Sequence, residues 1–90
     1  MRVPLTILLT VMALGTTLAQ SYAATCQDMW VERNTYYKAA GYCFETQKAI
    51  SYFGNAGCTV KNQNAVKLSA AAQKRIGEIV AEEKKQGCSD

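Results

Sequence analysis

The stretch WVERNTYYKAAGYCF, residues 30–44, carries most of the aromatic side chains of this chain around a single glycine. Residues that repeat every three or four positions share one face of a helix, and this periodicity aligns Trp30, Asn34 and Tyr37. The pattern predicts an α-helix from about Gln27 to Ala40. The aromatic residues on its face are candidates for the core of the fold.

Gly41 follows directly after this predicted helix. A residue just past a helix end often adopts a positive φ, a conformation that glycine tolerates better than any other residue. With Gly41 at that position, Tyr37 and Tyr42 occupy the two places that make the apolar contact of a Schellman motif. The glycine and both tyrosines are therefore explained by a helix stop.

Two further helices are predicted from local signals. A short one runs from about Gln47 to Phe53 with Thr46 as its N-cap, and a longer one begins after the N-cap Ser69 and ends at about Gln86. The chain between them is polar and irregular, with a short extended piece at Thr59-Val60. The long helix carries an inward stripe that ends in a charge: Leu68, Ala72, Ile76, Ile79, Val80 and Glu83.

The N-terminus has the layout of a secretory signal peptide, residues 1–23. A positive charge is followed by an uncharged stretch from Val3 to Ala19, and small residues precede a cleavage site after Ala23. An uncleaved membrane anchor and a lipoprotein are the alternatives. We expect one exported domain, residues 24–90, in the periplasm or outside the cell and without a stable membrane span after cleavage.

Four cysteines, Cys26, Cys43, Cys58 and Cys88, fall in this exported part. An even number of cysteines in a small exported chain indicates two disulfides, which also staple a domain too small for a large core. The chain has no histidine and no Cys-x-x-Cys pair, so we expect no metal and no cofactor. Of three connectivities, an antiparallel pairing of the first two helices favours Cys26–Cys58 with Cys43–Cys88.

Composition argues against most catalytic and nucleic-acid functions. The formal net charge is +3, with basic and acidic residues interleaved, which does not predict nucleic-acid binding. Without histidine, a Gly-x-Ser-x-Gly motif or a phosphate loop, only a carboxylate pair such as Glu32 and Glu45 remains for acid–base chemistry. We interpret the protein as not an enzyme, with an envelope hydrolase as the remaining catalytic alternative.

Four residues of the first helix are candidates for ligand binding: Trp30, Arg33, Asn34 and Tyr36. Together they could form a polar-aromatic patch suited to a sugar or a peptide. The competing interpretation is structural, with Asn34 tying the helix to the loop near residues 58–66 and Arg33 reaching a carboxylate or a C-terminal carbonyl. An exposed Trp30 favours ligand binding, whereas a buried one favours a scaffold role.

The stretch resembles the signature of the YARHG family, a bacterial module presumed to act outside the cytoplasm. Phe53 also fits the second aromatic site of that family, but Lys38, Ala39 and Ala40 replace the alanine, arginine and histidine of its name. The resemblance covers residues 24–90 and implies a fold and a location rather than an activity. The matching positions are Trp30, Arg33, Asn34, Tyr37, Gly41, Tyr42 and Phe44.

Two functions remain after these exclusions. The first is a non-enzymatic interaction module, an all-α domain of three helices stapled by two disulfides, which binds envelope material or an exported protein. The alternative is a small inhibitor or accessory subunit of an exported enzyme. A rigid, stapled domain suits that role because little conformational entropy is lost when it docks.

Overall fold

The computed structural model describes residues 24–89, which fold into three α-helices and one short 3-10 turn. Helix α2 spans Cys26–Ala39, α3 spans Gln47–Phe53, η2 spans Gln63–Ala65 and α4 spans Ala70–Gln86. The predicted all-α class and the three helices are confirmed. The predicted signal peptide, residues 1–23, lies outside the described residues.

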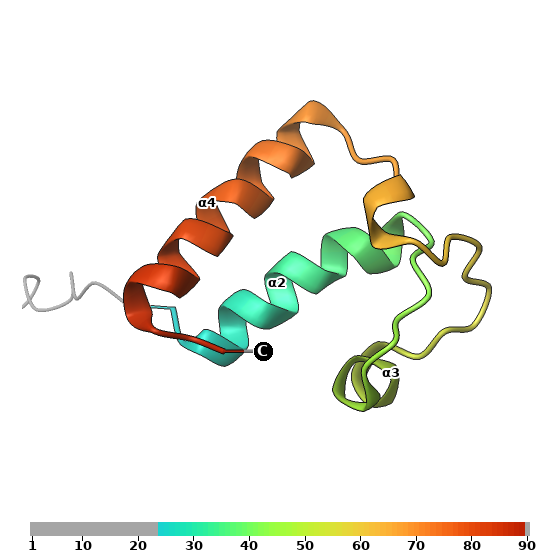
Figure 1. The fold of residues 1–90 in the computed structure, drawn as a ribbon, viewed down its shortest axis with the longest axis horizontal. Coiled ribbons are helices and arrows are strands. Elements are labelled where there is room, and N and C mark those ends of the chain that lie inside the picture. Colours follow the sequence, from blue (N-terminus) through green and yellow to red (C-terminus); the bar gives the residue numbers. More distant parts are fainter. Residues whose placement is uncertain (1–23, 90) are drawn as a thin grey trace, which may run out of the picture.

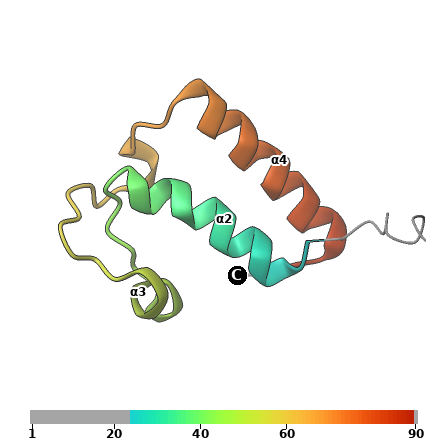
Figure 2. The same ribbon diagram turned by 180° about the vertical axis from the view of Figure 1, so that it is seen from behind.

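Helices α2 and α4 pack side by side and run in opposite directions, as both views show (Figure 1, Figure 2). Helix α3 is seen end-on beside them, so it does not run alongside α2 (Figure 1). No helix within residues 24–89 combines the length and apolar character that a membrane crossing requires.

Side-chain caps fix where each helix begins. Thr25 accepts a hydrogen bond from the Asp28 backbone, and the Asp28 carboxylate accepts one from the Thr25 N–H, which completes a capping box. This cap starts α2 at Cys26, one residue earlier than expected. Thr46 and Ser69 cap α3 and α4, as predicted, with side chains that accept from the backbone N–H groups of Ala49 and Ala72.

The end of α2 is a complete Schellman motif. Gly41 has a φ of +88°. The Tyr42 N–H donates to the Tyr37 carbonyl at 3.1 Å, and the Gly41 N–H donates to the Lys38 carbonyl at 3.1 Å. The Tyr37 and Tyr42 rings meet edge to face with centroids 5.9 Å apart. The predicted helix stop is confirmed together with its apolar contact.

The extended piece Thr59-Val60 pairs with the chain just after this stop. The Gly41 carbonyl accepts from the Thr59 and Val60 N–H groups at 2.8 and 3.0 Å, and the Cys43 N–H donates to the Val60 carbonyl at 2.8 Å. The Cys43–Cys58 disulfide closes the same junction. These contacts hold the loop that leads towards α4 against the end of α2.

The aromatic stretch forms one half of the core. Trp30 of α2, Tyr42 and Phe44 of the following segment, and Ala49 of α3 are buried in one cluster. Phe53, at the end of α3, stacks on Phe44 with ring centroids 5.1 Å apart. The other buried apolar side chains lie on the two paired helices: Met29, Ile76 and Ile79.

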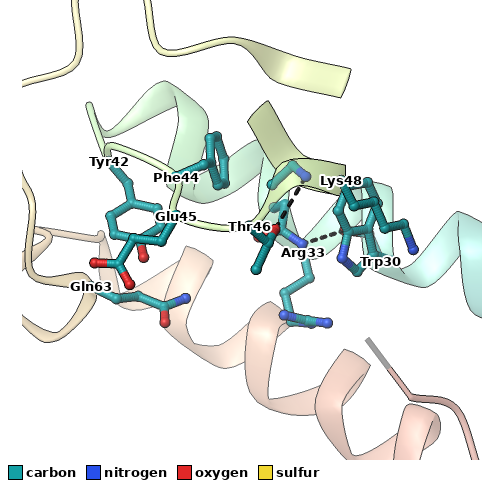
Figure 3. A pocket seen from close by; sticks show the side chains of 10 residues that line it. Trp30, Arg33, Tyr42, Phe44, Glu45, Thr46, Lys48 and Gln63 are labelled. Atoms are coloured by element: carbon teal, nitrogen blue, oxygen red, sulfur yellow. Dashed lines mark hydrogen bonds between the residues drawn. The ribbon is translucent and has the colours of Figure 1, made fainter. Parts of the chain in front are cut away.

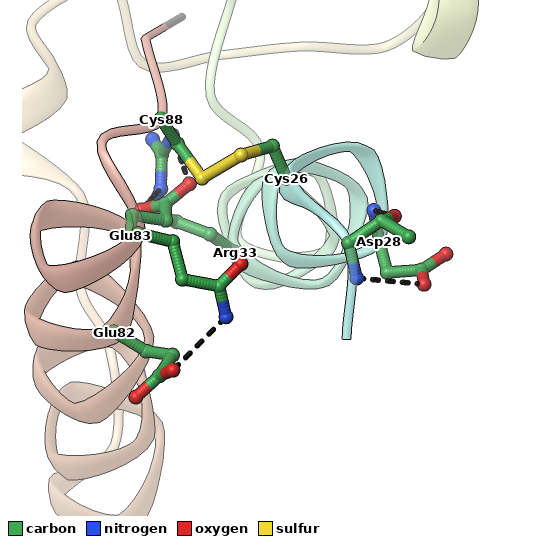
Figure 4. The surroundings of a disulfide bond; sticks show 8 residues. Cys26, Asp28, Arg33, Glu82, Glu83 and Cys88 are labelled. Carbon is green, nitrogen blue, oxygen red and sulfur yellow. Dashed lines mark hydrogen bonds and ion pairs between the residues drawn. A yellow bond between two sulfur atoms is a disulfide. The ribbon is translucent and has the colours of Figure 1, made fainter. Parts of the chain in front are cut away.

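The disulfide pairing that we expected is wrong. The bonds are Cys26–Cys88 and Cys43–Cys58. The antiparallel neighbour of α2 is α4 rather than α3, because only α4, with 17 residues, is long enough to cover α2. This arrangement brings the end of α4 to the start of α2, where Cys88 meets Cys26 (Figure 4).

We expect Gly41→Ala to lower the free energy of unfolding by about 1–2 kcal/mol, because an L-residue is strained at positive φ. An added Cβ would also lie 3.0 Å from the Thr59 Oγ1. Gly77 is the matched control, since it sits inside α4 with open space around it. Gly77→Ala should stabilise the helix by about 0.5–1 kcal/mol. Urea unfolding followed by circular dichroism measures both, and an unchanged Gly41→Ala midpoint would contradict the helix-stop explanation.

Candidate functional site

A pocket of about 310 Å³ opens where α2, α3 and the segment between them meet (Figure 3). We call it the Trp30 pocket. Its floor consists of buried side chains: Trp30, Asn34, Tyr42, Phe44 and Ala49. Its rim is more exposed and mostly polar: Arg33, Glu45, Thr46, Lys48 and Gln63.

Trp30 is held firmly in the floor of this pocket. Only 5% of its surface is exposed. Its ring packs against Phe53 and meets the edge of Tyr52, with centroids 5.7 Å away in both cases. The Lys48 Nζ lies 4.1 Å from its ring centroid, a cation–π contact at the rim. The burial supports the scaffold role of Trp30 and leaves no open ring face on which a sugar could stack.

Asn34 lies one helical turn after Trp30 and is 6% exposed. Its Nδ2 donates to the Trp30 carbonyl at 3.0 Å, so the amide bonds back to its own helix and not to the loop at residues 58–66 as we expected. Within residues 24–89, the Asn34 Oδ1 accepts no hydrogen bond and the Trp30 indole N–H donates none. The pocket floor therefore holds a buried acceptor and a buried donor.

Arg33 projects from α2 towards α4. Its Nε and Nη2 donate to the two carboxylate oxygens of Glu83 at 2.9 and 3.0 Å, a bidentate pair. The two side chains are only 12% and 11% exposed, and the pair lies beside the Cys26–Cys88 bond (Figure 4). The prediction that Arg33 reaches a carboxylate is confirmed, and its main contact joins the two long helices.

The two carboxylates that were considered for catalysis are not brought together in the pocket. Hydrogen bonds from Arg75 to Glu32, at 2.7 and 2.8 Å, lower the pKa of the Glu32 carboxyl, and Glu32 does not line the pocket. Glu45 stands on the pocket rim. Burial raises the pKa of the Tyr42 hydroxyl, and the charge of Glu45 raises it further. The pocket thus holds the Glu45 carboxyl near the hydroxyl of Tyr42, which stays neutral.

Three of the four predicted ligand residues, Trp30, Arg33 and Asn34, line the pocket, whereas Tyr36 does not. Sequence reasoning missed Lys48 and Gln63. No periodic or motif signal marks either residue, because both reach the pocket only through the packing of separate segments against α2. Among the described residues, no group of three or more histidine, cysteine, aspartate and glutamate side chains could hold a metal ion.

Comparison with known proteins gives one match. The family model of the YARHG domain matches residues 5–84 of the chain. No curated protein and no solved structure matches the chain. The matched range contains Trp30 and the other residues that line the pocket.

Proposed function

The chain belongs to the YARHG domain family, and from this premise we propose that it is a non-enzymatic interaction module that binds a component of the cell envelope through the Trp30 pocket. The family and the two disulfides fit an extracellular or periplasmic protein. An envelope ligand is accessible to a protein in either place. The pocket is the site that this proposal assigns to the ligand.

The observation that carries the proposal is the contrast between the floor and the rim of the pocket. The floor is built from the aromatic stretch that folds the domain, and it is rigid because its side chains are packed. On the rim, Lys48 and Glu45 form no ion pair with any residue in the range 24–89. Their charges are therefore available to a ligand, and few side chains have to be ordered when it binds.

The chemistry of the pocket supports binding rather than catalysis. All four cysteines are in disulfides, so none is a free thiolate nucleophile. Glu32 is engaged by Arg75, which leaves Glu45 as the carboxylate of the pocket. Glycoside hydrolysis, the chemistry considered for Glu32 and Glu45, typically uses a pair of carboxylates that flank the scissile bond, and the pocket lining contains one.

A second candidate function rests on a different surface. Ile50 and Tyr52 of α3 are large apolar side chains that are 36% and 57% exposed. Large apolar side chains that are exposed favour docking to a protein, as an inhibitor or accessory subunit of an exported enzyme would require. Ile50→Ser should abolish such docking and leave binding in the Trp30 pocket unchanged.

The envelope proposal is tested by co-sedimentation of the exported, oxidised protein with purified cell-wall sacculi. We expect the wild type to pellet with the sacculi and Lys48→Met to stay in the supernatant. Methionine retains an unbranched side chain over the Trp30 ring but removes the charge. Lys67→Met is the matched control, because Lys67 is also exposed and lies outside the pocket. Absence of the wild type from the pellet would contradict envelope binding.

A further inference from the structure

The two unpaired groups in the floor of the Trp30 pocket indicate what kind of ligand fits it. The indole N–H of Trp30 and the Oδ1 of Asn34 come from positions i and i+4 of α2, so they lie on the same helix face. Each residue is more than nine-tenths buried. Buried polar groups are satisfied by a partner, and a donor beside an acceptor matches the N–H and C=O that one extended residue presents on the same edge of a peptide.

The charges around the pocket indicate which way such a peptide would be oriented in it. Lys48 and Trp30 lie at one end of the pocket, and Glu45, Tyr42 and Gln63 at the other (Figure 3). Lys48 forms no ion pair with residues 24–89, whereas the charge of Arg33 is already bound to Glu83. An anionic group is therefore attracted to the Lys48 end and repelled from the Glu45 end.

The burial of the aromatic side chains favours a peptide over a sugar as the ligand. Trp30, Tyr42 and Phe44 are all buried, so the pocket offers no exposed ring on which a pyranose could lie. Its volume of about 310 Å³ is at the lower end of the ~300–1,000 Å³ range of small-molecule pockets. A ligand segment with small side chains fits such a space.

We propose that the Trp30 pocket binds the carboxyl-terminal end of a peptide. The carbonyl of the penultimate residue accepts from the Trp30 indole, the N–H of the same residue donates to the Asn34 Oδ1, and the terminal carboxylate pairs with Lys48. This assignment rests on the proposed function, since it names the ligand of the same pocket. Two sources share this chemistry: a cell-wall stem peptide, which ends in D-residues, and the C-terminus of a protein, which ends in an L-residue.

Trp30 is the single tryptophan of the chain, so selective excitation of tryptophan reports directly on this pocket. The probes are N-acetyl-alanyl-alanine in the D,D and L,L forms, the matching ester in which an oxygen replaces the N–H of the penultimate residue, and the matching C-terminal carboxamide. We expect one stereoisomer to bind. The ester and the carboxamide should each bind about tenfold more weakly or worse, because each leaves a polar group of the pocket without its partner.

Substitution of Lys48 tests whether the terminal carboxylate of the peptide contacts this residue. Lys48→Met should weaken binding of the free acid to the level of the carboxamide and leave binding of the carboxamide unchanged, while Lys67→Met binds both probes like the wild type. Lys48 is exposed on α3, so its replacement should not disturb the fold, and circular dichroism of each variant checks this. Equal loss of both probes in Lys48→Met would overturn the contact between Lys48 and the carboxylate.

The remaining outcomes separate this inference from the proposed function. Binding of the D,D form supports a wall peptide, and binding of the L,L form supports a protein terminus. The wild type could pellet with sacculi, and Lys48→Met fail to do so, while no peptide changes the Trp30 fluorescence. That result would overturn the peptide assignment and leave envelope binding intact. A response to N-acetylglucosamine alone would overturn it in favour of a sugar. If the protein binds neither sacculi nor any of the peptides, both proposals are refuted.

Discussion

Replacing Cys26 and Cys88 together by serine is expected to lower the free energy of unfolding by about 4 kcal/mol, according to the chain-entropy model of a disulfide. The bond joins residues 62 apart in sequence, so it restricts nearly the whole unfolded chain of the described domain. A domain of this size has a net stability of only about 5 kcal/mol. The double serine variant should therefore retain only about 1 kcal/mol of stability, and a substantial fraction of it should be unfolded at 37 °C.

The second disulfide provides the internal comparison. Cys43 and Cys58 are 15 residues apart, and the same model gives about 3 kcal/mol for this shorter loop. Urea unfolding of the two double serine variants, measured under identical conditions, gives the order of their stabilities. A Cys43/Cys58 variant less stable than the Cys26/Cys88 variant would contradict the role of the longer bridge as the main staple.

Replacing Arg33 by methionine is expected to lower the free energy of unfolding by about 3 kcal/mol, because it leaves the buried Glu83 carboxylate without its bidentate partner. Glu83 lies in the last turn of α4, and the pair connects this turn to α2 next to the Cys26–Cys88 bond. Loss of the guanidinium thus affects the same junction as loss of that disulfide.

Arg75→Met is the matched control for this prediction. Arg75 also binds a carboxylate with two hydrogen bonds, to Glu32, but the two side chains are 46% and 40% exposed. Solvent weakens such a pair, so Arg75→Met should change stability little. Addition of Glu83→Leu to Arg33→Met should restore most of the loss, because it removes the stranded charge. Equal effects of Arg33→Met and Arg75→Met in urea unfolding would show that burial of the Glu83 pair does not matter.

The local features of this fold could be predicted from the sequence because short-range chemistry determines them. Thr46 and Ser69 were identified as N-caps by residue type, and Gly41 as a helix stop by its position after the aromatic repeat. The cap at Thr25 shifted the start of α2 by one residue. In each case the signal lies within about one helical turn of the feature, where few competing arrangements exist.

Features that depend on which helix packs against which could not be predicted. The disulfide pairing followed from a choice of α3 as the neighbour of α2, whereas the longer α4 takes that place. The predicted partner of Asn34 was also wrong, because its amide donates to the Trp30 carbonyl one turn back in its own helix. Lys48 reaches the Trp30 ring only because α3 is turned across the end of the aromatic stretch.

The pocket residues also show why scaffold and site were hard to separate in the sequence. Trp30 is a core residue by its burial and a pocket residue by the position of its ring. Asn34 stabilises its own helix through Nδ2 while its Oδ1 has no partner within the described chain. The same aromatic stretch thus builds the fold and the floor of the proposed site.

Occupation of the Trp30 pocket can be measured directly by NMR. With one tryptophan in the chain, the ¹⁵N–¹H spectrum contains one indole N–H cross-peak, and hydrogen bonding to a ligand shifts it. Upon addition of solubilised sacculus fragments, we expect this cross-peak to move in the wild type and in Lys67→Met but to remain in place in Lys48→Met. A fixed indole cross-peak, with shifts confined to the amides of Ile50 and Tyr52, would contradict the pocket as the binding site and place the ligand beside these two exposed side chains of α3.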